Sequence, residues 1–171
     1  MNVVSTAELG QQVDLGLLNK HAWGRYDLDI YPAGYLKDGW MLGQVTVFHT
    51  GKMISVGANS IKSSLNNLDR AMVLLLSAKL IESVKIKPKV RNIVASVDLE
   101  GPLDLHALVR SSPRAIYEPE QFPGVIMKSK GESISFLIFA SGKAVVAGAK
   151  TLAELRFALR RLKEMTSRER Q

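Results

Sequence analysis

The opening stretch, Asn2-Val3-Val4-Ser5-Thr6-Ala7-Glu8-Leu9, recurs ninety residues later as Asn92-Ile93-Val94-Ala95-Ser96-Val97-Asp98-Leu99. Two further blocks recur in the same order at an offset of 91 residues: Phe48-His49-Thr50-Gly51-Lys52 as Phe139-Ala140-Ser141-Gly142-Lys143, and Gly57-Ala58 as Gly148-Ala149. Ordered matches of this kind indicate a duplicated unit. We assign residues 1–85 to the first repeat and 86–171 to the second, within one compact structural unit. A pseudo-twofold protein suits a partner of similar symmetry, such as a DNA duplex.

The composition predicts a folded intracellular protein. The chain has 171 residues, of which 46% are hydrophobic and 23% charged, which is typical of globular domains. No apolar run approaches the roughly 18 residues that a membrane span requires, and we expect no signal peptide and no membrane partner. The chain has no cysteine, so disulfides and thiolate metal sites are excluded. A chain without cysteine fits an intracellular or a thermophilic protein.

The charge of +7 is concentrated in the second repeat. Residues 1–85 hold 8 lysines and arginines against 7 acidic residues, whereas residues 86–171 hold 15 against 9. A basic balance favours polyanionic partners, although this signal alone is weak.

Each repeat predicts the element order β-α-β-β-β-β-α, which is an α+β fold. A strand over 2–8 or 92–98 is followed by a short helix, capped by Asp14 or Asp104, and the repeat closes with a longer helix. Asp38-Gly39 predicts a two-residue hairpin and Thr50-Gly51 a tight turn. The equivalents in the second repeat are Ser129-Lys130-Gly131 and Ser141-Gly142. In the short helices we expect Leu15, Leu18, Leu105 and Leu108 to be buried. The long helix of the first repeat is capped by Ser60, and its predicted buried face is Ile61, Leu65, Leu68 and Met72. The long helix of the second repeat begins with the capping box Thr151–Glu154, and its predicted buried face is Leu152, Leu155, Leu159 and Leu162.

Ten strands with only four helices leave one sheet face uncovered, and that face is unusually apolar. In 135–139, Phe136 and Ile138 point to one side and Leu137 and Phe139 to the other, because side chains alternate along a strand. An exposed apolar face usually marks a binding surface. The alternative is that another subunit or further helices cover it, and the pattern alone leaves both open.

At these residues the sequence resembles the TATA-binding protein family, especially its short archaeal members. The resemblance covers essentially the whole chain and implies a saddle, in which two pseudo-symmetric repeats form one curved ten-stranded antiparallel sheet with four helices on the convex face. It also implies a transcription initiation factor, not an enzyme, without metal or cofactor. Such a factor would lie in the cytoplasm or nucleoid of an archaeon, or in the nucleus if the source were eukaryotic. The segments that carry it in the second repeat are Arg91-Asn92-Ile93-Val94-Ala95-Ser96, Tyr117-Glu118-Pro119-Glu120-Gln121-Phe122-Pro123-Gly124, Phe139-Ala140-Ser141-Gly142-Lys143 and Gly148-Ala149-Lys150.

The resemblance also implies which residues bind. A/T-rich TATA-box DNA would be held in its minor groove and bent, and the implied partners are transcription factor B and the RNA polymerase preinitiation complex. For DNA it implies two pairs of aromatic wedges, Tyr31 with Phe48 and Phe122 with Phe139, and two donors to base acceptors, Asn2 and Asn92. It implies an apolar floor made of Val4, Ile54, Val94, Leu137 and Val145. It also implies four lysines that contact phosphates: Lys37, Lys52, Lys128 and Lys143. For transcription factor B it implies Glu118, Glu120 and Gln121.

The chain departs from the family pattern, mostly in the first repeat. Tyr31 replaces a phenylalanine, Thr46 replaces a leucine, and the segment 26–31 is acidic. Val56 and Ala147 stand where the family usually has threonines, which removes two polar contacts. These departures keep an alternative open: a divergent member that acts as a regulatory protein-interaction module, with weak or altered DNA binding.

The remaining motifs do not support an enzyme. Gly51-Lys52 and Gly142-Lys143 are followed by Met53 and Ala144, so the phosphate-binding loop Gly-x4-Gly-Lys-Ser/Thr is absent. The three histidines have no metal-ligand spacing, and no pair of carboxylates can be assigned to one cleft.

Overall fold

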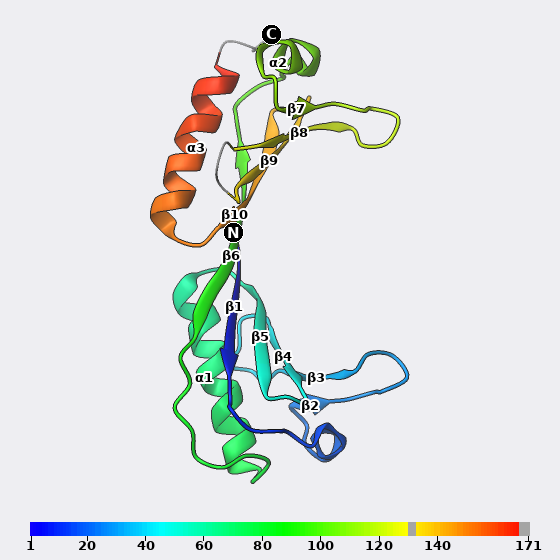
Figure 1. The fold of residues 1–171 in the computed structure, drawn as a ribbon, viewed down its shortest axis with the longest axis vertical. Coiled ribbons are helices and arrows are strands. Elements are labelled where there is room, and N and C mark those ends of the chain that lie inside the picture. Colours follow the sequence, from blue (N-terminus) through cyan, green and yellow to red (C-terminus); the bar gives the residue numbers. More distant parts are fainter. Residues whose placement is uncertain (130–132, 168–171) are drawn as a thin grey trace. The chain divides into compact units, whose positions relative to one another are not determined.

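The computed structural model describes residues 1–129 and 133–167, which fall into two compact units, 1–91 and 92–171. The first unit contains β1 (Asn2–Glu8), η1 (Leu15–Lys20, a 3-10 helix), β2 (Gly24–Arg25), β3 (Ala33–Leu36), β4 (Gln44–Phe48), β5 (Lys52–Ala58) and α1 (Ile61–Ser77). The second contains most of β6 (Lys89–Asp98), then α2 (Leu105–Ser111), β7 (Ala115–Ile116), β8 (Gly124–Lys128), β9 (Ser135–Phe139), β10 (Lys143–Ala149) and α3 (Leu152–Thr166) (Figure 1).

The strands form one ten-stranded antiparallel sheet in the order β2-β3-β4-β5-β1-β6-β10-β9-β8-β7. The predicted α+β class, the element order of each repeat and the ten strands are therefore confirmed. Among the described residues, no helix is long and apolar enough to cross a membrane.

Residues 86–91 pack with the first unit rather than the second. The side chain of Ile86 lies against the first unit's hydrophobic core, together with Val84. The Nε of Arg91 donates a hydrogen bond to the Thr6 hydroxyl on β1 at 2.8 Å. The boundary between the units therefore follows Arg91.

The helix caps form as predicted, each because a side-chain oxygen accepts from a free N–H of the first turn. Asp14 accepts from the Gly16 N–H and Asp104 from the Ala107 N–H, both at 3.0 Å. Ser60 accepts from Ser63 N–H, and Thr151 from Glu154 N–H, both at 3.1 Å. The Glu154 carboxylate accepts from Lys150 N–H, one residue before the cap, so the capping box is displaced by one residue.

The predicted two-residue hairpin at Asp38-Gly39 is wrong, because residues 37–43 form a longer loop between β3 and β4. Asp38 is held by contacts that a hairpin turn would not make. One carboxylate oxygen accepts from the Trp40 N–H at 3.0 Å, and the other pairs with Arg70 on α1 at 2.6 Å. Met41 is buried in the core and anchors the loop. Its predicted counterpart, 129–131, lies mostly outside the described residues.

The turn after β4 forms as predicted, and its second-repeat copy matches it. The Gly51 N–H donates to the Phe48 carbonyl, and the Gly142 N–H to the Phe139 carbonyl, both at 2.9 Å. Both glycines have positive φ, 82° and 81°, which other residues rarely adopt.

The buried faces of the long helices differ from the predicted ones at several positions. In α3, Leu152 is 42% exposed, and Ala158 occupies the face with Leu155 and Leu162. In α1, Leu68 is buried as predicted, but Ile61, Leu65 and Met72 are only half-buried. The fully buried α1 positions include the polar Ser64 and Asn67.

Those two side chains close a polar cluster inside the first unit, made of Ser5, Ser55, Ser64 and Asn67. The Ser64 hydroxyl lies 2.9 Å from that of Ser5 and 3.3 Å from that of Ser55. The Asn67 amide donates to the Leu42 carbonyl at 2.7 Å and to the Ser55 hydroxyl at 3.3 Å. Each of the four is at most 2% exposed, so the hydrogen bonds offset the cost of burying polar groups.

Candidate nucleic-acid interface

In each unit the described helices pack against a single face of the sheet. In the first unit α1 lies on β1, β4 and β5, and η1 on β2 and β3; in the second, α3 lies on β10 and α2 on β7 and β8 (Figure 1). Side chains along β1 alternate accordingly. Val3 and Ala7 are buried under the helix, whereas Val4 and Thr6, which point to the other face, are half-buried. Each unit therefore presents an open sheet face, as the strand pattern indicated.

Cross-strand partners form a row across each open face. In the first unit Thr6 and Thr46 flank Ile54, and Tyr35 continues the row. In the second unit Ser96 and Leu137 flank Val145, and Ile126 continues it. Of the residues in these two rows, only Ile54, Leu137 and Val145 were predicted from the sequence to form the apolar floor. The others follow from the strand register, which requires knowing the partner of each strand.

Two phenylalanines meet at one end of the second open face. The ring centroids of Phe122 and Phe139 lie 5.7 Å apart with a tilt of 58° between their planes. Gly124, paired with Phe139 across the strands, makes room for this packing. A Cβ at Gly124 would lie 3.0 Å from Phe122 and 3.2 Å from Phe139. The rings form a ridge of half-buried aromatic surface.

The equivalent pair in the first unit also meets, but with a different geometry. The rings of Tyr31 and Phe48 lie 6.3 Å apart, edge to face at 70°. Tyr31 also stacks on Tyr35, again at 6.3 Å, and 42% of its surface is exposed. The structure therefore brings together both predicted aromatic pairs.

The same backbone turn places the first ring of each pair. In the loop between β7 and β8, the N–H groups of Gln121 and Phe122 donate to the Glu118 carbonyl, both at 2.9 Å. In the loop between β2 and β3, the N–H groups of Ile30 and Tyr31 donate to the Asp27 carbonyl at 3.3 and 3.0 Å. Each ring is thus presented from a turn with defined geometry.

Asn2 and Asn92 occupy matching positions next to irregularities in strand pairing. β5 carries one extra residue opposite β1 between Val3 and Ser5, and β10 is interrupted in the same way opposite β6. The Asn2 side-chain carbonyl accepts from Gly57 N–H at 3.1 Å, and that of Asn92 from Gly148 N–H at 2.8 Å. Since the carbonyls are used, the amide N–H groups remain as donors for a ligand.

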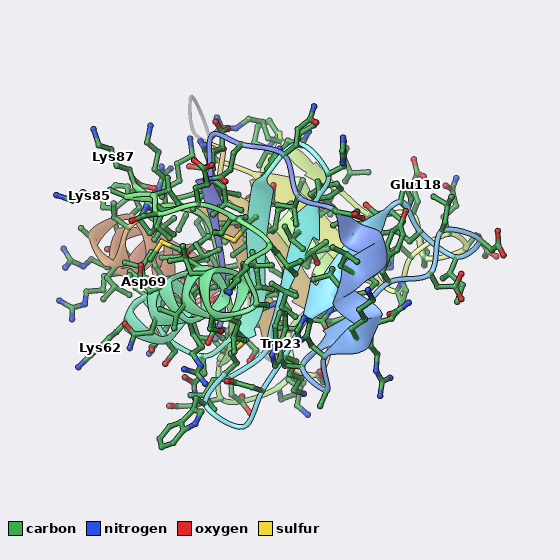
Figure 2. The ribbon with its side chains drawn as sticks, turned by 90° about the horizontal axis from the view of Figure 1, so that it is seen from below. Trp23, Lys62, Asp69, Lys85, Lys87 and Glu118 are labelled. Atoms are coloured by element: carbon green, nitrogen blue, oxygen red, sulfur yellow. The ribbon has the colours of Figure 1, made fainter. Side chains whose placement is uncertain are left out.

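The four predicted phosphate contacts, Lys37, Lys52, Lys128 and Lys143, are all exposed and lie at strand ends or just beyond them. Val4 and Val94, predicted for the floor, are half-buried on the open sides of β1 and β6. Glu118, Glu120 and Gln121 are exposed on the β7–β8 loop, and the Glu118 side chain extends away from the ribbon into solvent (Figure 2). The described residues contain no cluster of His, Asp or Glu that could hold a metal.

Comparison with known proteins identifies the family. Residues 87–167 match the family described as transcription factor TFIID, or TATA-binding protein. The TATA-box-binding protein of Cenarchaeum symbiosum is 44% identical over 91% of this chain and 86% of its own length. This chain belongs to the TATA-box-binding protein family. The TATA-box-binding protein of Archaeoglobus fulgidus is 30% identical over 95% of this chain and 91% of its own length.

The solved structure of the Methanococcus jannaschii TATA-binding protein shares the fold. It superposes with a TM-score of 0.83 at 25% identity, and the match covers 96% of this chain and 95% of the other. The resemblance stated from the sequence is therefore confirmed, and membership in a non-enzymatic family agrees with the prediction that the chain is not an enzyme. The family profile matches residues 87–167, which is most of the second repeat.

Proposed function

We propose that this protein is a general transcription initiation factor that binds A/T-rich TATA-box DNA in the minor groove, bends it and recruits transcription factor B to a preinitiation complex with RNA polymerase. Its relatives are TATA-box-binding proteins. The observation that carries the proposal is the pair of aromatic rings on each open, largely apolar sheet face. Such a function places the protein inside the cell, at the chromosome.

The chemistry of the open face suits the minor groove. A·T pairs present only acceptors there, whereas G·C pairs add the guanine amino group. An apolar floor such as Val145 and Leu137 would desolvate that amino group without offering an acceptor, which disfavours G·C pairs. The amide N–H groups of Asn2 and Asn92 match the acceptors of A·T pairs.

The aromatic pairs supply the bending. Apolar wedges inserted between base steps unstack them and kink the duplex, a mechanism for which TATA-binding proteins are themselves the type case. Flexible TA steps lower the energy of this deformation, which adds sequence preference without base contacts.

The direct test is a mobility-shift and bending assay on A/T-rich duplexes, with and without transcription factor B. We expect a bent complex with the protein alone and a larger, more stable one with transcription factor B. Glu118→Lys with Glu120→Lys should abolish only the second step, and Asp69→Lys with Glu164→Lys, at two exposed helix positions, is the charge-matched control. No complex at low salt in either arrangement would refute the proposal.

A second candidate function is supported by the exposed loop between β2 and β3. Leu28 and Ile30 are 65% and 78% exposed and alternate with the exposed Asp27 and Asp29. An acidic and apolar loop suits a protein partner better than DNA phosphates. The alternative is a regulatory module that captures transcription factor B, and binding to that factor without measurable DNA affinity would select it.

A further inference from the structure

A ribbon of four cations runs along the edge of the first unit, beside β1. Lys85, Lys87, Lys89 and Arg91 occupy alternate positions and are all exposed. The intervening residues are half-buried, and Val84 and Ile86 pack against the core. Half-burial of every second residue shows that the segment packs on the protein, so the four charges do not belong to a flexible linker.

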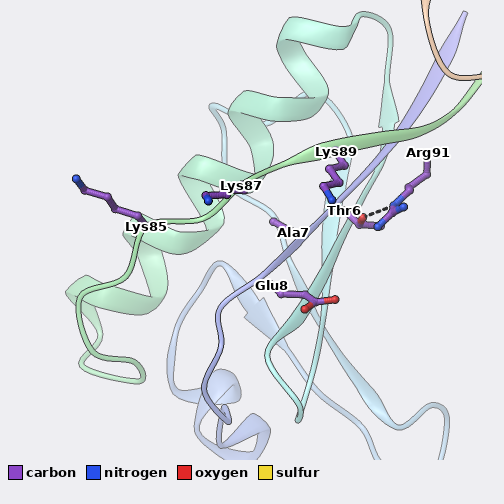
Figure 3. Close-up of a pocket in the computed structure, with 7 residues that line it drawn as sticks. All are labelled: Thr6, Ala7, Glu8, Lys85, Lys87, Lys89 and Arg91. Atoms are coloured by element: carbon purple, nitrogen blue, oxygen red, sulfur yellow. Dashed lines mark hydrogen bonds between the residues drawn. The ribbon is translucent and has the colours of Figure 1, made fainter.

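These cations line a groove together with β1. Its walls are Thr6, Ala7 and Glu8 on one side and the four cations on the other (Figure 3). The Arg91 Nε is fixed by its hydrogen bond to Thr6. Seen from another direction, the side chains of Lys85 and Lys87 extend side by side into solvent (Figure 2).

The positive charge of this groove is not neutralised by the protein. Within the described residues, the two salt bridges are Arg70–Asp38 and Arg110–Asp104, and neither involves a groove residue. Glu8 is the one carboxylate in the groove lining. Clustered cations without counterions indicate that an anion from outside lowers the electrostatic energy.

The spacing of the charges fits a row of phosphates. Alternate residues of a fully extended chain are about 6.6 Å apart, so the Cα atoms of the four cations span at most about 20 Å. The spacing between neighbouring cations is close to the distance between successive phosphates along a nucleic-acid strand. Lysines hold phosphates as flexible point charges, whereas Arg91 is fixed in orientation.

The groove adjoins the candidate DNA-binding face. Thr6 belongs to the open-face row with Ile54, and Glu8 pairs across the strands with Lys52, a predicted phosphate contact. A duplex lying on this floor would bring its backbone close to the groove. We infer that Lys85, Lys87 and Lys89, with Arg91, form a phosphate-tracking site for the backbone of bound duplex DNA, an inference that rests on the proposed function.

The salt dependence of DNA binding tests this site. Each neutralised phosphate contributes about 0.9 to the slope of log affinity against log salt. The triple variant Lys85→Gln/Lys87→Gln/Lys89→Gln should therefore lower the slope by about 2.7, measured by fluorescence anisotropy on an A/T-rich duplex over a potassium chloride series. The matched control, Lys20→Gln/Lys62→Gln/Lys79→Gln, removes three exposed lysines of the same unit and gives the same net charge, +4 instead of +7. It should change the slope by less than about one.

A substitution of opposite sign sharpens the test. Glu8→Gln removes the negative charge from the groove and should raise DNA affinity at low salt, whereas Glu82→Gln, outside the groove but equally exposed, should not. Equal slopes for the two triple variants would overturn the site while leaving the proposed function intact. A triple variant with an unchanged DNA slope and weakened binding to transcription factor B would make the groove a protein site, which also overturns it. If the unaltered protein bound no duplex, the proposed function would fail first.

Discussion

The two repeats share a fold but differ in what they bury. The first unit buries Ser5, Ser55, Ser64 and Asn67, whereas the equivalent positions of the second are Ala95, Val146, Leu155 and Ala158. The open faces differ in the same direction, since the first row contains two threonines and a tyrosine where the second has a serine, a leucine and an isoleucine. A duplicated backbone thus tolerates a polar interior if every polar group finds a partner.

The aromatic pairs provide the largest test of this comparison. Phe122→Ala with Phe139→Ala should abolish the bend at the second repeat and lower affinity for A/T-rich DNA roughly 100-fold, because the wedge that holds the unstacked step is lost. Tyr31→Ala with Phe48→Ala should cost less, roughly tenfold, because that pair carries a hydroxyl. Bending can be measured by energy transfer between dyes at the duplex ends.

Both double variants should fold, since the rings are half-buried or exposed rather than in the core. Circular dichroism should therefore match that of the unaltered chain. Unchanged bending in the Phe122/Phe139 variant would rule out the wedge assignment. Equal losses in the two variants would remove the functional difference between the repeats.

The buried polar cluster provides the second test, on stability. Asn67→Ala leaves the Leu42 carbonyl and the Ser55 hydroxyl without this donor and should lower the free energy of unfolding by about 1–3 kcal/mol. Both tryptophans, Trp23 and Trp40, lie in the first unit, so their fluorescence during urea unfolding reports on this unit.

Replacing the whole cluster should cost much less. The variant Ser5→Ala/Ser55→Val/Ser64→Leu/Asn67→Ala installs the residues of the second unit and removes the side-chain donors and acceptors together, so that among the cluster's hydrogen bonds only the backbone carbonyls of Leu42 and Val3 lose a partner. Conversely, Ala158→Asn would bury an amide in a nonpolar site and should destabilise the second unit. A quadruple variant less stable than the single one would show that the two cores are not interchangeable.

Local sequence patterns predicted most of the fold, because they act over a few residues. Alternation gave β1 as residues 2–8, and the caps Asp14, Ser60, Asp104 and Thr151 act within three residues of themselves. The alternation along 135–139 was also correct, since Phe136 and Ile138 are buried and Leu137 and Phe139 are only half-buried. The duplication helped further, because each repeat supported the assignment of the other.

What the sequence could not predict depends on distant partners. Asp38 resembles a hairpin residue, but it pairs with Arg70, 32 positions away. Ser64 and Asn67 resemble surface residues of a helix, and only their partners on β1, β5 and the β3–β4 loop explain their burial. The sequence of 85–91 shows its positive charge, but only the structure shows that the segment lies beside β1.

The hydroxyl of Tyr31 gives a third, smaller test. If this ring enters the base stack, its hydroxyl loses water, at a cost of about 1 kcal/mol. Tyr31→Phe should therefore raise affinity for A/T-rich DNA roughly fivefold, and Phe122→Tyr should lower it by a similar factor. Fluorescence anisotropy at one salt concentration measures both. A loss of affinity in Tyr31→Phe would mean that the hydroxyl makes a contact of its own.

The short helices give the smallest test. Their capping aspartates have different partners, since Asp14 accepts from the Gly16 N–H, whereas Asp104 accepts from the Ala107 N–H and also lies 3.9 Å from Arg110. In the second repeat the N–H of Ala107, followed by that of His106 and the charge of Arg110, holds the pKa of Asp104 below its ordinary value of 3.8. A carboxylate with a lowered folded pKa stabilises the folded state at pH above the unfolded pKa, and that contribution disappears as the pH falls through the folded pKa. Amide chemical shifts of α2 should therefore change with a midpoint below pH 3.8. In Asp104→Asn, which can still cap but cannot titrate, that step should be absent, and a step that persists would assign the titration to another group.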